Sequence, residues 1–212
     1  MDIAILAFDG VDELDLVGPF EVFSRAAQMG AKVRVRIAAV RGEAQLVGGY
    51  GLRYGTDGPL GAAPGLLIVP GGGWVSRVPR GVRAEIERGD LPRLIAQAHA
   101  GGAKIASVCT GVMAVAASGI IGNRPATTHR AAMGDLRATG ATIVDAHVVD
   151  DRDVISSGGV THGIDLALWL VERFFGAPTA QSIATVLEYQ RTTSIWVSPG
   201  TLAEIEAAAP GR

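Results

Sequence analysis

Short apolar runs alternate with stretches of helical hydrophobic spacing along almost the whole of this 212-residue chain. Residues 3–8 (IAILAF) are apolar without a break, which indicates a strand buried on both faces, as in a parallel sheet. Further along, Ile164, Leu168 and Val171 recur at the spacing of one helix face. This alternation predicts an α/β fold, a doubly wound sandwich with a mostly parallel central sheet.

The same alternation continues as far as residue 190. Further strands are expected at residues 33–40, 66–69, 104–108, 141–144 and 153–156. Further helices are expected from Gly18-Pro19 onward, at 91–100 after a cap by Asp90, at 112–118 and at 181–189. No repeat, low-complexity linker or break in composition interrupts the chain. We therefore expect one domain over residues 1–190 and an irregular tail over 191–212.

Charge and composition exclude several classes of protein. The chain has 19 Lys and Arg against 21 Asp and Glu, a net charge of −2, which is not the cationic field that nucleic-acid binding requires. Its apolar stretches are too interrupted by charges to cross a membrane, and its N-terminus lacks the basic leader of a secretion signal. The single cysteine, Cys109, allows no internal disulfide and suits a reducing compartment. We expect a cytoplasmic protein without nucleic-acid or membrane partners.

Three of the predicted strand ends carry residues suited to chemistry. In a doubly wound sheet, ligands bind beyond the carboxyl ends of the strands. Residues 12–15 follow the first strand, residues 70–73 (PGGG) follow a middle strand, and Cys109-Thr110 follow the next one. We expect these loops to converge on one crevice that binds a small-molecule substrate.

Cys109 has the setting of a nucleophile. It stands between a strand and a helix of small residues, the order in which α/β proteins present a nucleophile on a sharp, strained turn. Gly111 and Ala114 would let the strand and the helix approach closely, and the helix N-terminus would favour the thiolate. The alternative is a buried, inert cysteine, which is common in cytosolic proteins that have only one.

Asp15 could supply a proton beside that cysteine. A carboxyl facing the cysteine across the crevice could be kept protonated by burial and donate a hydrogen bond to the thiolate. Alternatively, Asp15 caps the helix that opens at Gly18-Pro19, or faces water. Three neighbouring carboxyls compete for the role: Asp9, Asp12 and Glu13.

The glycines and one histidine could complete the site. The bare backbone N–H groups of Gly71, Gly72 and Gly73 could hold a developing negative charge, or could form an ordinary turn. His129, in the segment ATTH, could act as a general base or could cap a helix that starts near Ala131.

Motifs for metals and cofactors are missing from the sequence. The other histidines, His99, His147 and His162, form no HxH or HxxxH pair with carboxylates, and one cysteine cannot build a thiolate-rich zinc site. His162 opens a helix and could simply cap it. Neither the GK[ST] of a P-loop nor a GxGxxG dinucleotide fingerprint occurs. We expect no metal and no organic cofactor.

Four segments carry a family resemblance: residues 8–23 (FDGVDELDLVGPFEVF), 66–73 (LLIVPGGG), 104–131 (KIASVCTGVMAVAASGIIGNRPATTHRA) and 156–172 (SSGGVTHGIDLALWLVE). They resemble the ThiJ/PfpI superfamily, and most closely its isonitrile (isocyanide) hydratases and the amidase-like domains of some AraC-type regulators. The resemblance spans residues 2–190. It implies a flavodoxin-like, class I glutamine amidotransferase-like domain with a nucleophile elbow, usually assembled as a homodimer.

The resemblance also implies roles for individual residues. Cys109 would be the nucleophile and Asp15 its protonated carboxyl partner. The backbone at Gly72 and Thr110 would form the oxyanion pocket, with the Thr110 hydroxyl near the reacting atoms. Thr110 stands where peptidase-like and glyoxalase-like members carry His, which disfavours proteolysis. The chain also ends at Arg212, without the regulators' DNA-binding domain, so the pattern is that of the isonitrile hydratases.

The implied reaction adds water to an isonitrile and gives an N-substituted formamide. The Cys109 thiolate would attack the isonitrile carbon while Asp15 protonates the adduct, and Asp15 would then activate water to release formamide from a thioimidate. Two departures from the hydratases, His162 and Trp74, could reshape the crevice. The alternatives are another thiol-dependent reaction, glyoxalase-like or amide-hydrolysing, and a redox-sensing or ligand-binding protein whose Cys109 is oxidised.

Overall fold

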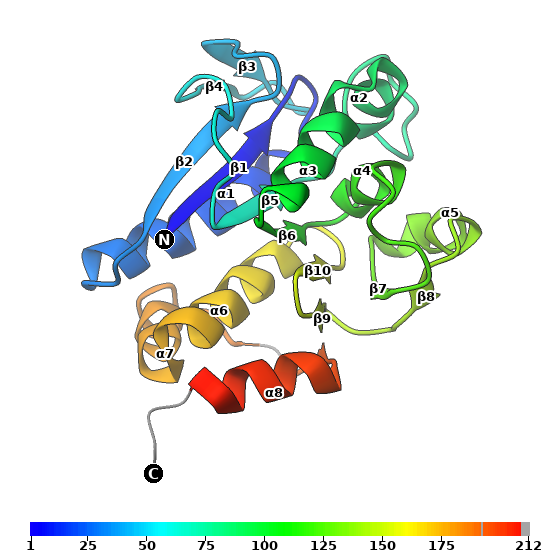
Figure 1. The fold of residues 1–212 in the computed structure, drawn as a ribbon. Coiled ribbons are helices and arrows are strands. Elements are labelled where there is room, and N and C mark those ends of the chain that lie inside the picture. Colours follow the sequence, from blue (N-terminus) through cyan, green and yellow to red (C-terminus); the bar gives the residue numbers. More distant parts are fainter. Residues whose placement is uncertain (192, 209–212) are drawn as a thin grey trace.

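The computed structural model describes residues 1–191 and 193–208. Within these residues, seven strands form one sheet in the order β11-β9-β10-β6-β5-β1-β2 (Figure 1). Neighbouring strands are parallel except for the antiparallel pair β9–β10. The strands of this sheet are β1 (Asp2–Ala7), β2 (Arg34–Ala39), β5 (Leu66–Val69), β6 (Lys104–Ser107), β9 (Val148–Asp151), β10 (Val154–Ser157) and β11 (Ile195–Val197).

Helices cover both faces of this sheet. α1 packs against α6 and α7, whereas α2, α3 and α4 pack against one another on the opposite side (Figure 1). The helices are α1 (Glu13–Gln28), α2 (Val82–Arg88), α3 (Asp90–Ala100), α4 (Gly111–Ala117), α5 (Met133–Ala138), α6 (His162–Phe175), α7 (Ala177–Val186) and α8 (Pro199–Ala208), with a 3-10 turn η1 (Arg130–Ala132). The flavodoxin-like α/β fold with a mostly parallel sheet is confirmed.

The central strands owe their position to uninterrupted apolar sequence. Ile3, Ile5 and Leu6 of β1 are fully buried, and so are all four residues of β5. Because helices lie on both faces, both sets of alternating side chains enter the core and no polar face is needed. Among the described helices, none is both long and apolar enough to cross a membrane.

The first helix begins earlier than the sequence predicts. α1 starts at Glu13, and its N-cap Asp12 accepts a hydrogen bond from the Leu14 N–H at 3.2 Å. The expected start at Gly18-Pro19 is wrong, because Pro19 lies inside the helix, where it only fails to donate to the carbonyl of Asp15. The earlier start places Asp15 on the first turn of a buried helix rather than in a loop. Likewise, Asp90 is the first residue of α3 and not its cap.

Smaller elements also differ from expectation. The strand expected at residues 141–144 is the short β8 (Thr142–Ile143), which pairs with β7 (Pro125–Ala126) outside the main sheet. A second small sheet joins β3 (Gln45–Val47) to β4 (Arg53–Gly55). Residues 195–208 are regular instead of irregular, because β11 pairs with β9 at the sheet edge and α8 follows it. Three-residue strands are too short to produce a periodic pattern.

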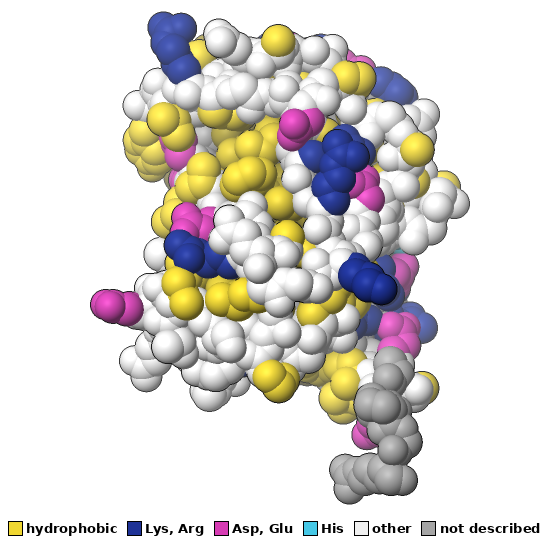
Figure 2. All heavy atoms as spheres, turned by 90° about the vertical axis from the view of Figure 1, so that its left-hand side faces the viewer, with side chains coloured by type: hydrophobic (Ala, Val, Ile, Leu, Met, Phe, Trp, Pro, Cys, Tyr) yellow, Lys and Arg dark blue, Asp and Glu magenta, His cyan; other side chains and the backbone are white. Residues whose placement is uncertain are grey.

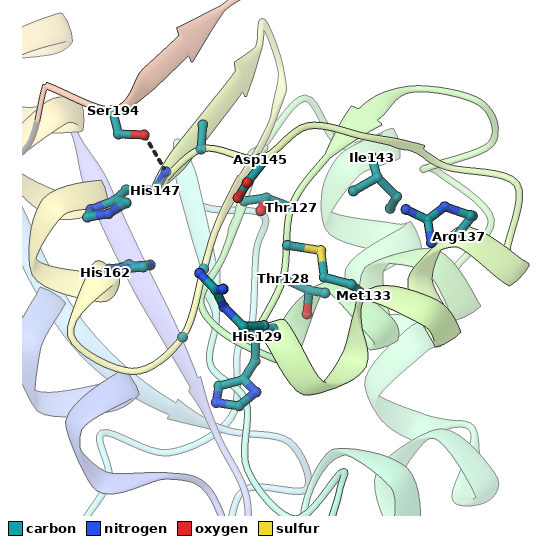
Figure 3. A pocket seen from close by; sticks show the side chains of 14 residues that line it. Thr127, Thr128, His129, Met133, Arg137, Ile143, Asp145, His147, His162 and Ser194 are labelled. Atoms are coloured by element: carbon teal, nitrogen blue, oxygen red, sulfur yellow. Dashed lines mark hydrogen bonds between the residues drawn. The ribbon is translucent and has the colours of Figure 1, made fainter.

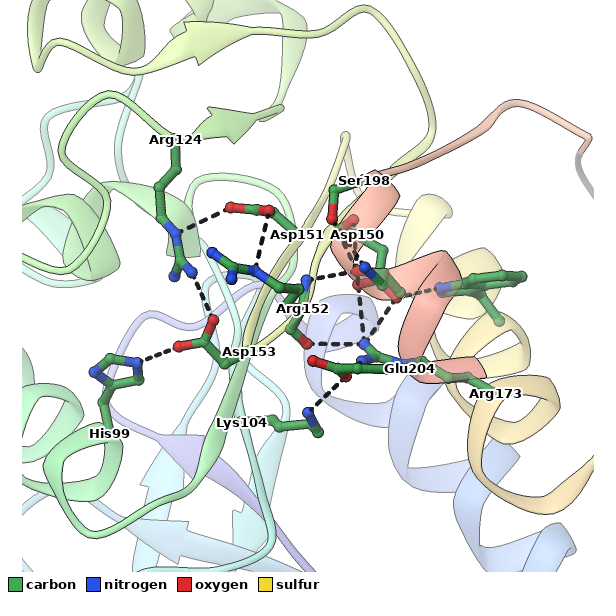
Figure 4. A network of polar contacts seen from close by, with 12 residues as sticks. His99, Lys104, Arg124, Asp150, Asp151, Arg152, Asp153, Arg173, Ser198 and Glu204 are labelled. Atoms are coloured by element: carbon green, nitrogen blue, oxygen red, sulfur yellow. Dashed lines mark hydrogen bonds and ion pairs between the residues drawn. The ribbon is translucent and has the colours of Figure 1, made fainter. Parts of the chain in front are cut away.

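A buried ion pair connects β9 to α6 and α8 (Figure 4). The carboxylate of Asp150, which is 0% exposed, accepts hydrogen bonds from Arg173 Nη1 at 2.9 Å, Trp169 Nε1 at 2.7 Å and Thr201 Oγ1 at 3.0 Å. Arg173 also pairs with Glu204 of α8 at 2.7 Å. These bonds satisfy a charge that would otherwise be costly inside the protein.

Replacing Arg173 with methionine is expected to lower the free energy of unfolding by about 3–5 kcal/mol, because it leaves the buried Asp150 carboxylate without its cation. Urea denaturation measures the loss. Arg25→Met is the matched control, since the Arg25–Glu21 pair on α1 is partly exposed and such pairs contribute less than about 1 kcal/mol. Equal effects of the two substitutions would contradict the structural role of the Asp150 pair.

Candidate active site

Cys109 lies on a strained turn between β6 and α4. Its φ angle is +55°, a left-handed conformation that side chains other than glycine adopt at a cost. The turn is held from both sides: the Cys109 N–H donates to the Gly158 carbonyl at 3.0 Å, and the Cys109 carbonyl accepts from Thr128 Oγ1 at 2.9 Å. The surrounding structure therefore fixes a conformation that the residue alone would avoid.

Gly111 permits the close approach of α4 to β5. A Cβ atom at this position would lie 2.0 Å from the Val69 carbonyl oxygen, which is far inside contact distance. Gly111→Ala is therefore expected to move the turn, lower the free energy of unfolding by about 1–3 kcal/mol and slow the alkylation of Cys109 by iodoacetamide.

Gly134→Ala on α5 is the control for that substitution. A Cβ atom there would meet nothing within 4 Å, and alanine is favoured over glycine inside a helix by about 1 kcal/mol. Chemical denaturation of both variants checks the pair. If Gly111→Ala were as stable as Gly134→Ala, the close packing at Gly111 would not contribute to the free energy of unfolding.

Asp15 lies at the side of this turn, entirely buried. Its Oδ2 accepts a hydrogen bond from the Gly71 N–H at 2.9 Å. Its Oδ1 is buried without a hydrogen-bond partner. The Cys109 thiol lies close enough to this carboxyl for each group to shift the pKa of the other.

The carboxyls that competed with Asp15 in the sequence have other partners. Asp12 caps α1. Asp9 Oδ1 accepts from the Val47 N–H at 2.9 Å, and Glu13 Oε1 accepts from the Tyr50 N–H at 2.8 Å. Asp9 and Glu13 therefore fasten the β3–β4 segment to the crevice rim, and Asp15 is the one among the four candidates that meets the cysteine.

Burial controls the protonation of both groups. Loss of solvation raises the pKa of Asp15 well above its usual value, and the neighbouring Asp12 adds to the shift. Burial also raises the pKa of the Cys109 thiol to about 12, with the charge of Asp15 as the second cause. The expectation that the helix N-terminus would favour the thiolate is not met, because desolvation outweighs the N–H groups of Val160 and Thr110 that face the sulfur.

The three loops converge as the sequence predicts. The Asp12 N–H donates to the Gly71 carbonyl at 2.9 Å, and the Gly72 N–H donates to Thr110 Oγ1 at 3.1 Å. Gly72 has a φ angle of +123°, and a Cβ atom there would lie 2.4 Å from the Asp12 nitrogen. Glycine is therefore required at this position. The Gly71 N–H thus donates to Asp15, and the Gly72 N–H donates to Thr110.

His129 follows β7 and caps the turn η1. Its Nδ1 accepts from the Ala131 N–H at 3.1 Å, which is the capping role considered as the alternative. Its ring lies against Gly159 and close enough to Asp12 to affect the pKa of that carboxyl. His129 therefore lies near both Gly159 and the N-cap residue of α1.

Two features of this region were not predicted from the sequence. Val160 is a β-branched residue with a φ angle of +36°, and its strained backbone turns its N–H toward the sulfur. A pocket of about 670 Å³ opens beside Thr128, His129 and Gly159, and its wall includes His147 and His162 (Figure 3). Trp74, in contrast, is held by Asp135, which accepts from Trp74 Nε1 at 2.7 Å.

Comparison with known proteins identifies the family. The model of the DJ-1/PfpI family matches residues 1–173. The chain belongs to the DJ-1/PfpI family. This confirms the resemblance to the ThiJ/PfpI superfamily that the four segments carry.

Individual relatives and solved structures are similar to this chain. An isonitrile hydratase of Pseudomonas putida is 31% identical over 191 residues, which are 89% of this chain and 78% of that protein. A ThiJ/PfpI family protein of Pseudomonas syringae has a solved structure with a TM-score of 0.79 and 25% identity, covering 97% of this chain and 85% of that one. An AraC family transcriptional regulator of Pseudomonas putida shares the fold, with a TM-score of 0.75 and 19% identity over 88% of this chain and 98% of that one.

Proposed function

We propose that this protein is a cysteine-dependent isonitrile hydratase, which adds water to an isocyanide to give an N-substituted formamide. One observation carries the proposal: the carboxyl of the fully buried Asp15 lies close enough to Cys109, a cysteine on a strained turn, for each group to shift the pKa of the other. Such a pair can move one proton between sulfur and oxygen without a histidine. The similarity to the Pseudomonas putida isonitrile hydratase supports the same choice.

The first step forms a carbon–sulfur bond. The raised pKa of Asp15 makes its carboxylate a competent base for the thiol, so the proton moves from Cys109 Sγ to Asp15 Oδ1 as the substrate arrives. The thiolate, held by the N–H groups of Val160 and Thr110, attacks the terminal carbon of the isonitrile. Asp15 returns the proton to that carbon, and the product is a thioimidate, RN=CH–S–Cys109.

The second step releases the formamide. The Asp15 carboxylate accepts a proton from water, whose oxygen attacks the thioimidate carbon. Asp15 returns that proton to the nitrogen, and the tetrahedral adduct RNH–CH(OH)–S–Cys109 then expels the sulfur, which takes the hydroxyl proton, giving RNH–CHO and the free cysteine. Thr110 Oγ1, which accepts a hydrogen bond from the Gly72 N–H at 3.1 Å, would orient the adduct. The cycle consumes one isonitrile and one water and needs no metal or organic cofactor.

The electrostatics of the site weigh against the alternatives. Oxidation of a sensor cysteine depends on thiolate character and exposure, whereas Cys109 is 6% exposed and its pKa is raised to about 12. A glyoxalase-like reaction has no histidine next to the cysteine, because Thr110 takes that place. The Asp15–Cys109 pair therefore favours a small, linear electrophile that can reach a nearly buried sulfur.

The test is turnover of an aliphatic isonitrile by the purified full chain, with the N-substituted formamide quantified by liquid chromatography and mass spectrometry. We expect formamide to accumulate in proportion to protein and time. Methylglyoxal is assayed in parallel. Consumption of methylglyoxal without formamide formation would overturn the hydratase proposal in favour of glyoxalase-like chemistry.

We further propose that the protein acts as a homodimer in the cytoplasm. Hydrophobic side chains gather on the side of the molecule where β2, α1 and α7 lie (Figure 2). The exposed hydrophobic residues of these two helices and of the α1 C-cap include Val17, Met29 and Val186. Light scattering on the purified protein is expected to give twice the chain mass of 21.8 kDa. The cytoplasmic location rests on the single cysteine, which suits a reducing compartment.

A further inference from the structure

A second cluster of side chains with ligand atoms lies in the wall of the large pocket. His147 precedes β9, His162 opens α6, and Asp165 stands one turn further along α6. One nitrogen or oxygen atom from each of the three lies within 4.8 Å of the others. Figure 3 shows His147 and His162 with their rings facing each other at one end of the pocket, whereas the ring of His129 points away from them. Cys109 does not line this pocket.

We propose that His147, His162 and Asp165 bind one divalent transition-metal ion through two imidazole nitrogens and a carboxylate oxygen. Imidazole and carboxylate together form the donor set that proteins use for zinc and for the neighbouring first-row ions. Spacing rules miss the cluster because His147 comes from a different element. The HxxD spacing of His162 and Asp165 is the local part of the pattern.

Two of the three donor atoms already lie at about the distance that separates two ligands of one metal ion. His147 Nδ1 lies 3.1 Å from Asp165 Oδ2. Two donors that bind one tetrahedral ion at about 2.0–2.1 Å are separated by about 3.3 Å. The ion can thus take the place of the proton that His147 shares with Asp165, and His147 then keeps its proton on Nε2.

His162 supplies the third ligand after a small movement. The two rings stack with centroids 3.8 Å apart and an interplanar angle of 18°, so one ion cannot lie in both ring planes. The second torsion of a histidine is broad, and rotation about it brings a ring nitrogen toward the ion. His162 Nδ1 is buried without a hydrogen-bond partner, so coordination would satisfy an atom that has none.

The surroundings suit an open metal site. The Tyr189 hydroxyl donates to Asp165 Oδ1 at 3.1 Å and orients the carboxylate, as groups behind metal ligands usually do. Gly158 makes room, since a Cβ atom there would lie 2.3 Å from His162 Nδ1. Ser194 and Asp145 also line the pocket, on the side where further ligands or water would complete the coordination.

The test uses the full chain, stripped with a chelator and titrated with Zn²⁺, and the bound zinc is counted by mass spectrometry after dialysis. We expect about one ion per chain in the wild type. His147→Gln and His162→Gln are each expected to weaken binding at least about tenfold. His99→Gln is the matched control, because His99 lies on α3 and pairs with Asp153 at 2.7 Å. Cys109→Ala excludes the thiol as the zinc ligand, and both of these variants should bind like the wild type.

A second measurement keeps the proposal falsifiable if the histidine variants fold poorly. Co²⁺ bound to the wild type should give the visible bands of a site with nitrogen and oxygen ligands and no thiolate charge-transfer band. Failure of the wild type to retain an ion, unchanged binding in both histidine variants, loss of binding in Cys109→Ala, or a thiolate band would each overturn the proposal.

Discussion

Replacing Cys109 with alanine is expected to lower kcat for formamide formation at least about 1,000-fold, because no other group in the site can form the covalent adduct. The reaction is followed by chromatographic quantification of the formamide. Cys109→Ala keeps the backbone strain of the turn, so its stability should stay close to that of the wild type. Activity above one-tenth of the wild-type value, which is a loss of less than about 1.4 kcal/mol in transition-state stabilisation, would remove Cys109 from the mechanism.

The Cys109→Gly variant tests the backbone strain of the turn separately from the catalytic role of the thiol. Glycine adopts a φ angle of +55° without the steric cost that other residues pay. This variant is expected to be as inactive as Cys109→Ala but more stable, by about 1 kcal/mol in the free energy of unfolding. A loss of stability in Cys109→Gly would show that the turn is not strained.

Replacing Asp15 with asparagine is expected to lower kcat by about 100- to 10,000-fold. Asparagine still accepts the hydrogen bond from Gly71 but cannot carry the proton. The pH profile gives the sharper result. In the wild type, the Asp15–Cys109 pair keeps one shared proton from the raised pKa of Asp15 up to the thiol pKa of about 12, so kcat/KM should be flat between these two pKa values and fall on the acid side of the Asp15 pKa.

Without the carboxyl, only ionised thiol reacts, and kcat/KM of Asp15→Asn should rise about tenfold for each pH unit below the thiol pKa. Asp9→Asn is the control, because Asp9 binds the Val47 amide and lies outside the catalytic pair. Its rate and its flat profile should match the wild type. A flat profile for Asp15→Asn would contradict the role of Asp15 as the proton carrier.

The same substitution should stabilise the fold at neutral pH. Burial raises the pKa of Asp15 in the folded state above its unfolded value, so the native protein binds the proton more tightly than the unfolded chain does. That contribution to stability is complete below the unfolded pKa and is lost as the pH rises through the folded pKa. Asp15→Asn should therefore have a higher Tm than the wild type at neutral pH, with a smaller difference near the usual aspartate pKa of 3.8. Thermal denaturation at both pH values measures this.

The sequence predicted the fold well wherever local pattern and tertiary environment agree. Residues 66–69 were expected as a strand and form β5 with the same limits, because an apolar run between loops has no alternative to burial. The pattern gave no indication of β11, which has only three half-buried residues and depends on pairing with β9. The start of α1 was misplaced because proline is favoured at the first position of a helix, whereas Pro19 lies inside α1, where packing compensates for its missing N–H.

The candidate site was predictable in its parts and less so in its electrostatics. Topology alone indicated that the loops bearing Asp15, Gly71 and Cys109 would converge. The sequence could not show that desolvation outweighs the helix N-terminus at the sulfur, since burial is a property of the whole fold. It also could not show the strained N–H of Val160 or the meeting of His147 with His162, which come from separate elements.

The most direct test of the central claim is to trap the covalent intermediate. The protein is mixed with excess isonitrile, quenched in acid within the first turnovers and digested, and the peptides are analysed by mass spectrometry. We predict that the peptide containing Cys109 gains the mass of one intact isonitrile, and that the adduct is absent from Cys109→Ala. Formamide production without any mass gain on Cys109, or with the adduct on another residue, would contradict the account.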